Sequence, residues 1–137
     1  MDLDEVRAKT PTYVYRKDGK DVECLVPFSS DIKFNLFIRD MNPAVREPER
    51  LDDGLCVYIK GAPERILNRC SKILVSGEEV DFDDELRAEV DEANYEFGSL
   101  GERVLAFARY RLPLDKYVKG QYEFDIKTWK QWGLNPR

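Results

Sequence analysis

Three short segments of the sequence carry side chains that could hold a ligand, and the first of them is residues 27–33. Phe28 follows a proline and leads into a short polar turn. This context favours a ring at the edge of a sheet, where it can stack on a flat ligand. The alternative is an ordinary core phenylalanine. Lys33 closes the segment and supplies a cation.

The second segment is residues 58–64, where a predicted strand runs directly into a predicted helix. Gly61 lacks a Cβ, so a ligand could approach the main chain closely at this junction, and Lys60 places a positive charge beside it. The start of the following helix also favours anions. The alternative is a connecting turn with a solvated lysine.

The third segment, residues 98–106, places Arg103 at the start of a predicted strand, after a turn that contains two glycines. The planar guanidinium of an arginine at this place could hold a phosphate or a ribose oxygen. The GxxxxGK[ST] and GxGxxG patterns of phosphate-binding loops are both absent, so the segment alone is a weak indication of a phosphate site.

Composition excludes several other kinds of chemistry. The chain has 137 residues, 22 Lys and Arg against 27 Asp and Glu, and no histidine. Without histidine, Ser-His-Asp or Cys-His catalysis and the usual zinc sites are excluded, and the acidic balance argues against nucleic-acid binding. Cys24, Cys56 and Cys70 form no CxxC pair and each sits in an apolar stretch, which is typical of buried thiols. We therefore predict no metal site.

Strands and short helices must position the three segments. Hairpin signals come before isolated helices, and the regular βαβ alternation of a doubly wound fold is missing. The sequence therefore predicts one α+β domain over residues 1–137, with a mainly antiparallel sheet flanked by helices. Strands are expected at residues 13–15, 22–26, 33–39, 55–60, 72–75 and 103–111. Helices are expected at residues 2–9 and 83–97, with a short amphipathic helix between them that has Pro63 in its first turn.

Local patterns refine these elements. An Asp-Gly pair predicts a hairpin turn at residues 17–20, and the strand at 33–39 places Phe34, Leu36 and Ile38 on one face. Gly98 and Gly101 are expected to end the helix at 83–97. Residues 40–54 are predicted to form a surface loop. The order of residues 125–137 stays open, with a disordered tail as one alternative.

Taken together, the three segments resemble the nucleotide-binding (N) domain of P-type cation-transporting ATPases. The KGAPE motif at 60–64, the segment 28–33 before it and the GERVL motif at 101–105 after it occur in the order of that family and at about its separations. The similarity runs from about residue 22 to residue 124. It looks nearest to the branch of sodium/potassium and proton/potassium pumps.

The resemblance implies ATP-binding roles for particular residues. Phe28 would stack on adenine, and Lys33 would lie deeper in the pocket. Lys60 and Gly61 would form its wall and mouth, and Arg103 would reach the ribose or the phosphates. The counterparts of two further residues also touch the nucleotide: Asn35 and Leu105.

The resemblance also implies a division of labour. Family members phosphorylate an aspartate in a DKTGT sequence of a separate domain that also binds magnesium, and no such sequence occurs here. The chain would then be an excised, soluble, monomeric fragment without catalytic residues, and Mg²⁺ would arrive with the nucleotide or act in the intact pump. Its parent would be an ATP-driven cation translocase, with this domain on the cytoplasmic side of a membrane. Its partners there would be the phosphorylation, actuator and transmembrane domains.

Charge is unevenly distributed along the chain. Residues 81–92 hold seven acids and one arginine, a local charge of −6 within the total of −5, which leaves +1 for the rest. Lys33, Lys60 and Arg103 can therefore form a positive pocket for a nucleotide if the acidic helix lies away from it. The alternative function is a self-contained cytosolic interaction module that uses the acidic helix to bind a basic partner.

Overall fold

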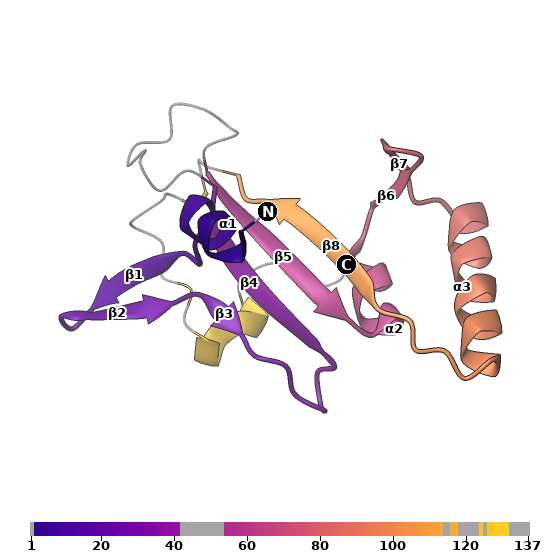
Figure 1. Ribbon diagram of the computed structural model, residues 1–137, viewed down its shortest axis with the longest axis horizontal. Helices are drawn as coiled ribbons and strands as arrows, with labels where there is room; N and C mark the ends of the chain where they lie inside the picture. Colours follow the sequence, from indigo (N-terminus) through magenta and orange to yellow (C-terminus); the bar gives the residue numbers. More distant parts are fainter. Residues whose placement is uncertain (1, 42–53, 114–115, 118–123, 125, 132–137) are drawn as a thin grey trace.

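A four-stranded antiparallel sheet forms the centre of the molecule (Figure 1). The structure is a computed structural model that describes residues 2–41, 54–113, 116–117, 124 and 126–131. The strand order is β3-β4-β5-β8, and the strands are β3 (Leu25–Val26), β4 (Phe34–Asp40), β5 (Leu55–Gly61) and β8 (Ala106–Arg111). The predicted α+β class with a mainly antiparallel sheet is confirmed.

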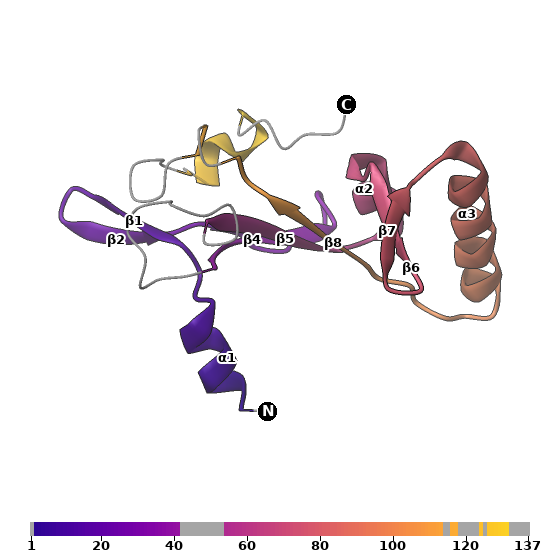
Figure 2. The same ribbon diagram turned by 90° about the horizontal axis from the view of Figure 1, so that it is seen from above.

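The hydrophobic core lies on one face of this sheet. Side chains along β4 alternate between buried and half-buried, with Phe34, Leu36 and Ile38 buried as the period of two predicts. Tyr117 and Phe124 also belong to the core, and their rings stack at 5.7 Å between centroids. Figure 2 shows the C-terminal 3₁₀ helix η3 (Ile126–Gln131) and the N-terminal helix α1 (Leu3–Lys9) on opposite sides of the sheet.

The N-terminal part follows the prediction with one correction. Strands β1 (Val14–Lys17) and β2 (Lys20–Glu23) pair through a turn in which Asp18 and Gly19 both have positive φ, as an Asp-Gly hairpin requires. The prediction of a single strand at 22–26 is wrong, because the chain passes at Cys24 from β2 in one sheet to β3 in another. The Cys24 N–H donates to the Tyr13 carbonyl and its carbonyl accepts from Ile38 N–H, so this residue joins the hairpin to β4.

After β5 the chain forms the short helix α2 (Pro63–Ile66) and the 3₁₀ turn η2 (Leu67–Arg69). Pro63 occupies the first helical position, which its fixed φ favours. A hairpin of β6 (Lys72–Val75) and β7 (Glu78–Asp81) follows, and then helix α3 (Asp84–Ser99). We refer to β6, β7 and α3 together as the acidic arm.

The acidic arm and β8 differ in detail from the prediction. Strand β7 was not expected, because its four residues show little apolar periodicity. Gly98 lies inside α3, which ends at Ser99. Of the two glycines expected to end the helix, only Gly101, with a φ of +80°, has the left-handed conformation of a terminating glycine. Strand β8 begins at Ala106, three residues after the predicted start.

Other expectations fall partly outside the described residues. The predicted surface loop at 40–54 overlaps β4 at Asp40, and its residues 42–53 are not described. The tail at 125–137 includes η3, while residues 125 and 132–137 are not described. Cys24 and Cys56 are buried as predicted, whereas Cys70 is only half-buried. Within the described ranges, no helix is long and apolar enough to cross a membrane.

Candidate nucleotide site

The predicted site lies where the 27–33 loop meets the end of β5. The Ala62 N–H donates to the Lys33 carbonyl at 3.0 Å, and the Lys33 N–H donates to the Ser29 carbonyl at 2.8 Å. Lys33 itself has a φ of +60°, which is unusual for a residue with a side chain. The loop is thus folded against the junction of strand and helix that carries Lys60 and Gly61.

Gly61 is required here by the chain's own backbone. A Cβ on this residue would lie 2.3 Å from the Lys33 carbonyl oxygen and 2.6 Å from the Phe34 Cα, both far inside van der Waals contact. The sequence argument assigned the glycine to the approach of a ligand. The structure shows instead that β4 already occupies the space beside it.

Three cross-strand neighbours form one row on the sheet face opposite the core. Asn35 of β4 pairs with Lys60 of β5, and Lys60 pairs with Phe107 of β8. Directly opposite residues of an antiparallel sheet place their side chains on the same face, so an amide, an ammonium group and an aromatic ring lie side by side. The Phe107 side chain is 73% exposed, and it is a candidate ligand contact that the sequence analysis did not nominate.

Phe28 is not a core residue. It is 64% exposed, which removes the core alternative and leaves its ring free to stack. Leu105, directly before β8, is 55% exposed. Large apolar side chains are normally buried, whereas the segments that meet here expose three of them. Their grouping indicates a surface that contacts a ligand or another part of a larger protein. The described residues include these three: Phe28, Leu105 and Phe107.

Three cations lie at the same end of the sheet. Ala106 pairs with Gly61, so Arg103, three residues earlier, lies beyond the end of β5 that carries Lys60. Figure 1 shows the 27–33 loop, the end of β5 and the segment entering β8 at this end. Within the described part of the chain, the exposed side chains of Lys33, Lys60 and Arg103 have no hydrogen-bond or ion-pair partner.

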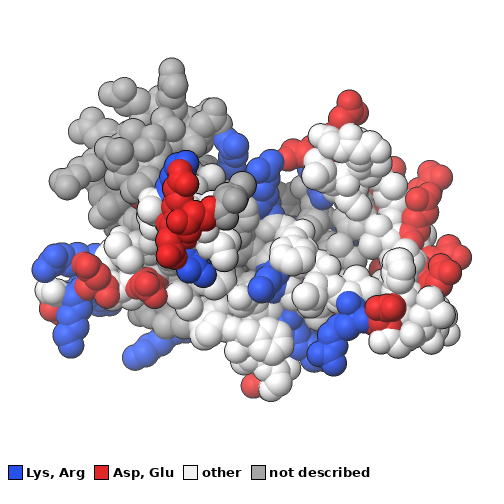
Figure 3. Space-filling model, viewed as in Figure 1, with Lys and Arg blue, Asp and Glu red and all other residues white. Residues whose placement is uncertain are grey.

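The acids lie mainly elsewhere. Figure 3 shows acidic side chains gathered along α3 at the right edge of the molecule and a second acidic group over α1, with lysines and arginines over the sheet between them. Figures 1 and 2 show the acidic helix α3 apart from the sheet that carries Lys60, as the sequence analysis required. An anionic ligand is therefore the one that this end of the sheet would attract.

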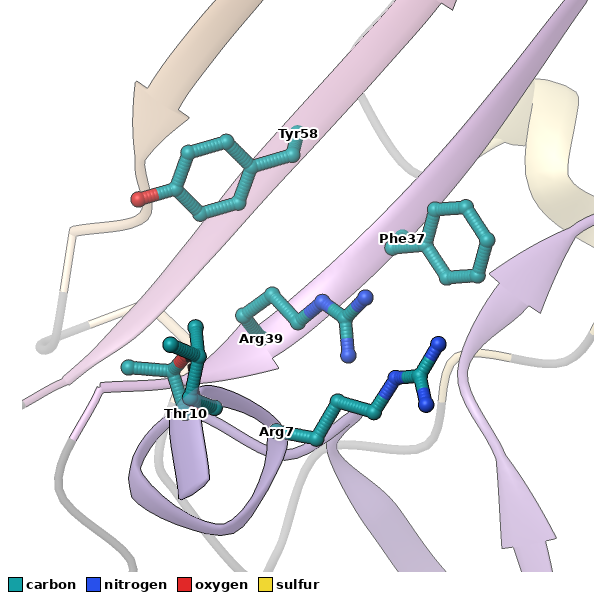
Figure 4. A pocket seen from close by; sticks show the side chains of 6 residues that line it. Arg7, Thr10, Phe37, Arg39 and Tyr58 are labelled. Carbon is teal, nitrogen blue, oxygen red and sulfur yellow. Dashed lines mark hydrogen bonds between the residues drawn. The ribbon is translucent and has the colours of Figure 1, made fainter. Parts of the chain in front are cut away.

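A separate pocket lies farther along the same sheet face. It has a volume of about 290 Å³ and lies between α1 and the strands β4 and β5, lined by Val6, Arg7, Thr10, Phe37, Arg39 and Tyr58. Figure 4 shows the guanidinium groups of Arg7 and Arg39 pointing the same way beneath Phe37. None of the predicted ATP-binding residues lines it. Among the described residues there is also no cluster of His, Cys, Asp and Glu that could hold a metal ion.

Comparison with known proteins places these features in a family. Residues 8–132 match the model of the P-type ATPase cytoplasmic domain N. The chain is 43% identical over 109 residues to the sodium/potassium-transporting ATPase subunit alpha-B of Artemia franciscana, a match that covers 80% of this chain and 10% of that protein. It is 42% identical over 100 residues to the human sodium/potassium-transporting ATPase subunit alpha-3, which covers 73% of this chain and 9% of that protein.

The match to the family covers most of the chain, whereas the chain spans only about a tenth of the length of these relatives. The matched region contains the 27–33 loop, the KGAPE motif and the segment that enters β8. The chain therefore belongs to the family of P-type ATPase cytoplasmic N domains, and its relatives are alpha subunits of sodium/potassium-transporting ATPases.

Proposed function

We propose that the end of the sheet around Gly61 binds ATP. The observation that carries this proposal is the grouping of Lys33, Lys60 and Arg103, none of which has a partner among the described residues, next to exposed aromatic rings. A nucleoside triphosphate combines a flat base with several negative charges. It would satisfy both kinds of group at once.

Each residue has a distinct role in this proposal. The Phe28 ring stacks on adenine, and the row of Asn35, Lys60 and Phe107 forms the surface beneath the nucleotide. Arg103 and Lys33 approach it from the two segments that border this row. Gly61 acts indirectly, because it allows β4 to lie close enough to hold the Lys33 loop in place. Leu105 adds apolar contact at the start of β8.

The chain supplies binding and orientation, and the covalent chemistry takes place on another domain. In this proposal the γ-phosphate is presented to an aspartate of a separate phosphorylation domain, so that proximity is the contribution of this domain. Mg²⁺ arrives with the nucleotide. The parent protein is then a cation-translocating ATPase that also has actuator and transmembrane domains, with this domain on the cytoplasmic side of the membrane.

The proposal is tested by removing one cation and measuring ATP affinity by calorimetry or NMR titration. Lys60→Ala is expected to raise the Kd about fivefold, because one charge pair at ~4 Å in water is worth ~1 kcal/mol. It should also reduce the salt dependence of binding. Lys20→Ala, in the β1–β2 hairpin, removes the same charge far from the site and serves as the matched control. Equal affinities for both variants would contradict the proposal.

A further inference from the structure

Apolar side chains of helix α3 are at most half-buried. Helix α3 has 16 residues, and none of them is buried. Figures 1 and 2 both show α3 standing apart from the four-stranded sheet. Polar contacts therefore contribute more to its position than they do for a helix with one buried face.

Arg87 provides such contacts. Its Nε donates to the Phe82 carbonyl at 3.2 Å, and its Nη1 and Nη2 donate to the carbonyls of Leu67 and Cys70 at 3.2 and 2.6 Å. The guanidinium also lies 4.2 Å from the centroid of the buried Phe82 ring. Among the described residues, Arg87 is the only side chain of α3 with a hydrogen bond to a segment outside the helix.

The three carbonyls belong to segments that lead to the candidate ATP site. Leu67 is in η2, and Cys70 directly follows this 3₁₀ turn. The Leu67 carbonyl accepts from the Cys70 N–H as well as from Arg87. Helix α2 begins two residues after Gly61. At its other end, α3 stops four residues before Arg103. Arg87 therefore joins the segment that follows Lys60 to the helix that precedes Arg103.

Arg87 lies within the acidic segment of the chain. The local charge of −6 at residues 81–92 lies on β7, α3 and the link between them, and Arg87 sits in the first turns of that helix. Charges act over roughly 10 Å at an ionic strength of 0.1 M. If the helix were free to swing towards the three cations, its carboxylates would compete with the phosphates of a nucleotide for them.

We propose that Arg87 is a positioning residue of the ATP site, which holds the acidic helix away from the cations by binding the carbonyls of Leu67, Cys70 and Phe82. This inference rests on the proposed ATP site. Arg87 does not touch the nucleotide and acts only through the placement of the arm. A lysine cannot replace it fully, because one ammonium group lacks the planar arrangement of donors that reaches three carbonyls in different directions.

The test compares ATP dissociation constants of the 137-residue chain and its variants at about 0.05 M and about 0.5 M NaCl. Arg87→Ala is expected to raise the Kd about 2- to 30-fold at low salt, the range usual for indirect coupling. Arg87→Lys should fall between this variant and the wild type. The matched control is Arg16→Ala, which removes the same charge from the β1–β2 hairpin.

A second measurement separates positioning from a merely structural role. Neutralising α3 with Glu89→Gln, Asp91→Asn and Glu92→Gln should restore most of the affinity of the Arg87→Ala chain. High salt weakens ATP binding in every variant, but it should bring the ratio of the Kd of Arg87→Ala to that of the wild type close to one. A loss that persists unchanged in the neutralised chain would overturn the inference. So would an Arg87→Ala chain with the affinity of Arg16→Ala. If Arg87→Ala does not fold, Arg87→Lys decides, because wild-type affinity in that variant would equally overturn the inference.

The two proposals fail in different ways. Absence of ATP binding by the wild-type chain would refute the proposed function itself, and the positioning role with it. Wild-type binding that is weakened in Lys60→Ala but unaffected in Arg87→Ala and Arg87→Lys would refute only the inference about Arg87.

Discussion

Replacement of Phe28 by alanine should weaken ATP binding without destabilising the fold. The ring is 64% exposed, so its removal leaves no cavity in the core. A fully buried aromatic side chain removes about 150–250 Å² from water, so about 100–160 Å² of Phe28 remains available to a ligand. A base that covers one face of the ring would bury about half of this area, which at about 25 cal/mol per Å² is worth about 1–2 kcal/mol.

This free energy corresponds to an increase in Kd of about 5- to 30-fold, within the range known for stacking of one base on an aromatic ring. NMR titration of the chain with ATP measures the change, and thermal unfolding checks that stability is retained. Phe28→Trp should keep most of the affinity, since it preserves a stacking surface. Tyr95→Ala, which removes an 80% exposed ring from α3, is the matched control.

Two results would refute the stacking role. One is a Phe28→Ala chain that binds ATP within twofold of both the wild type and Tyr95→Ala. The other is a large fall in melting temperature for Phe28→Ala, which would show that the ring supports the fold and is not free to stack.

Three further predictions concern the fold and its chemistry. Gly61→Ala should destabilise the chain by about 1–3 kcal/mol in chemical denaturation, because the new Cβ overlaps the Lys33 carbonyl, and unchanged stability would contradict the close approach of β4. Burial raises the pKa of the Cys24 thiol from 9.0 to about 12, so the unfolded chain loses this proton first and stability should fall as the pH rises from about 9 to about 12. The free energy of unfolding should fall by at most about 1.4 kcal/mol per pH unit over this range, and denaturant titrations of Cys24→Ala should lack this fall. Parallel pH profiles of stability for the wild type and Cys24→Ala would contradict the prediction. Finally, the chain mixed with Mg²⁺ and ATP should release no phosphate in a colorimetric assay, and release that is abolished in Lys60→Ala would show that catalysis does not need another domain.

The strands that carry the site could be predicted because their signals are local. The alternation along residues 33–39 placed Phe34, Leu36 and Ile38 on the buried face, and the structure confirms that face. The predicted strand at 55–60 corresponds to β5, and Pro63, three residues after it, marks the start of α2. These patterns depend only on the periodicity of neighbouring residues, which the sequence shows directly.

Features that depend on distant partners were missed. The break at Cys24 arises from backbone bonds to Tyr13 and Ile38, which no local pattern reveals. Phe107 became a candidate only when the register placed it opposite Lys60. The same limit explains why Gly61 was assigned to a ligand, since the close approach of β4 is a tertiary contact.

The family match and the exposed residues lead to one central claim, that the Gly61 end of the sheet binds ATP. An NMR titration that follows every amide as ATP is added to the chain up to millimolar concentration tests it most directly. The claim predicts shifts clustered on Phe28, Lys33, Gly61 and Arg103, and their loss in Phe28→Ala. No response at millimolar ATP, or shifts confined to α3, would contradict it.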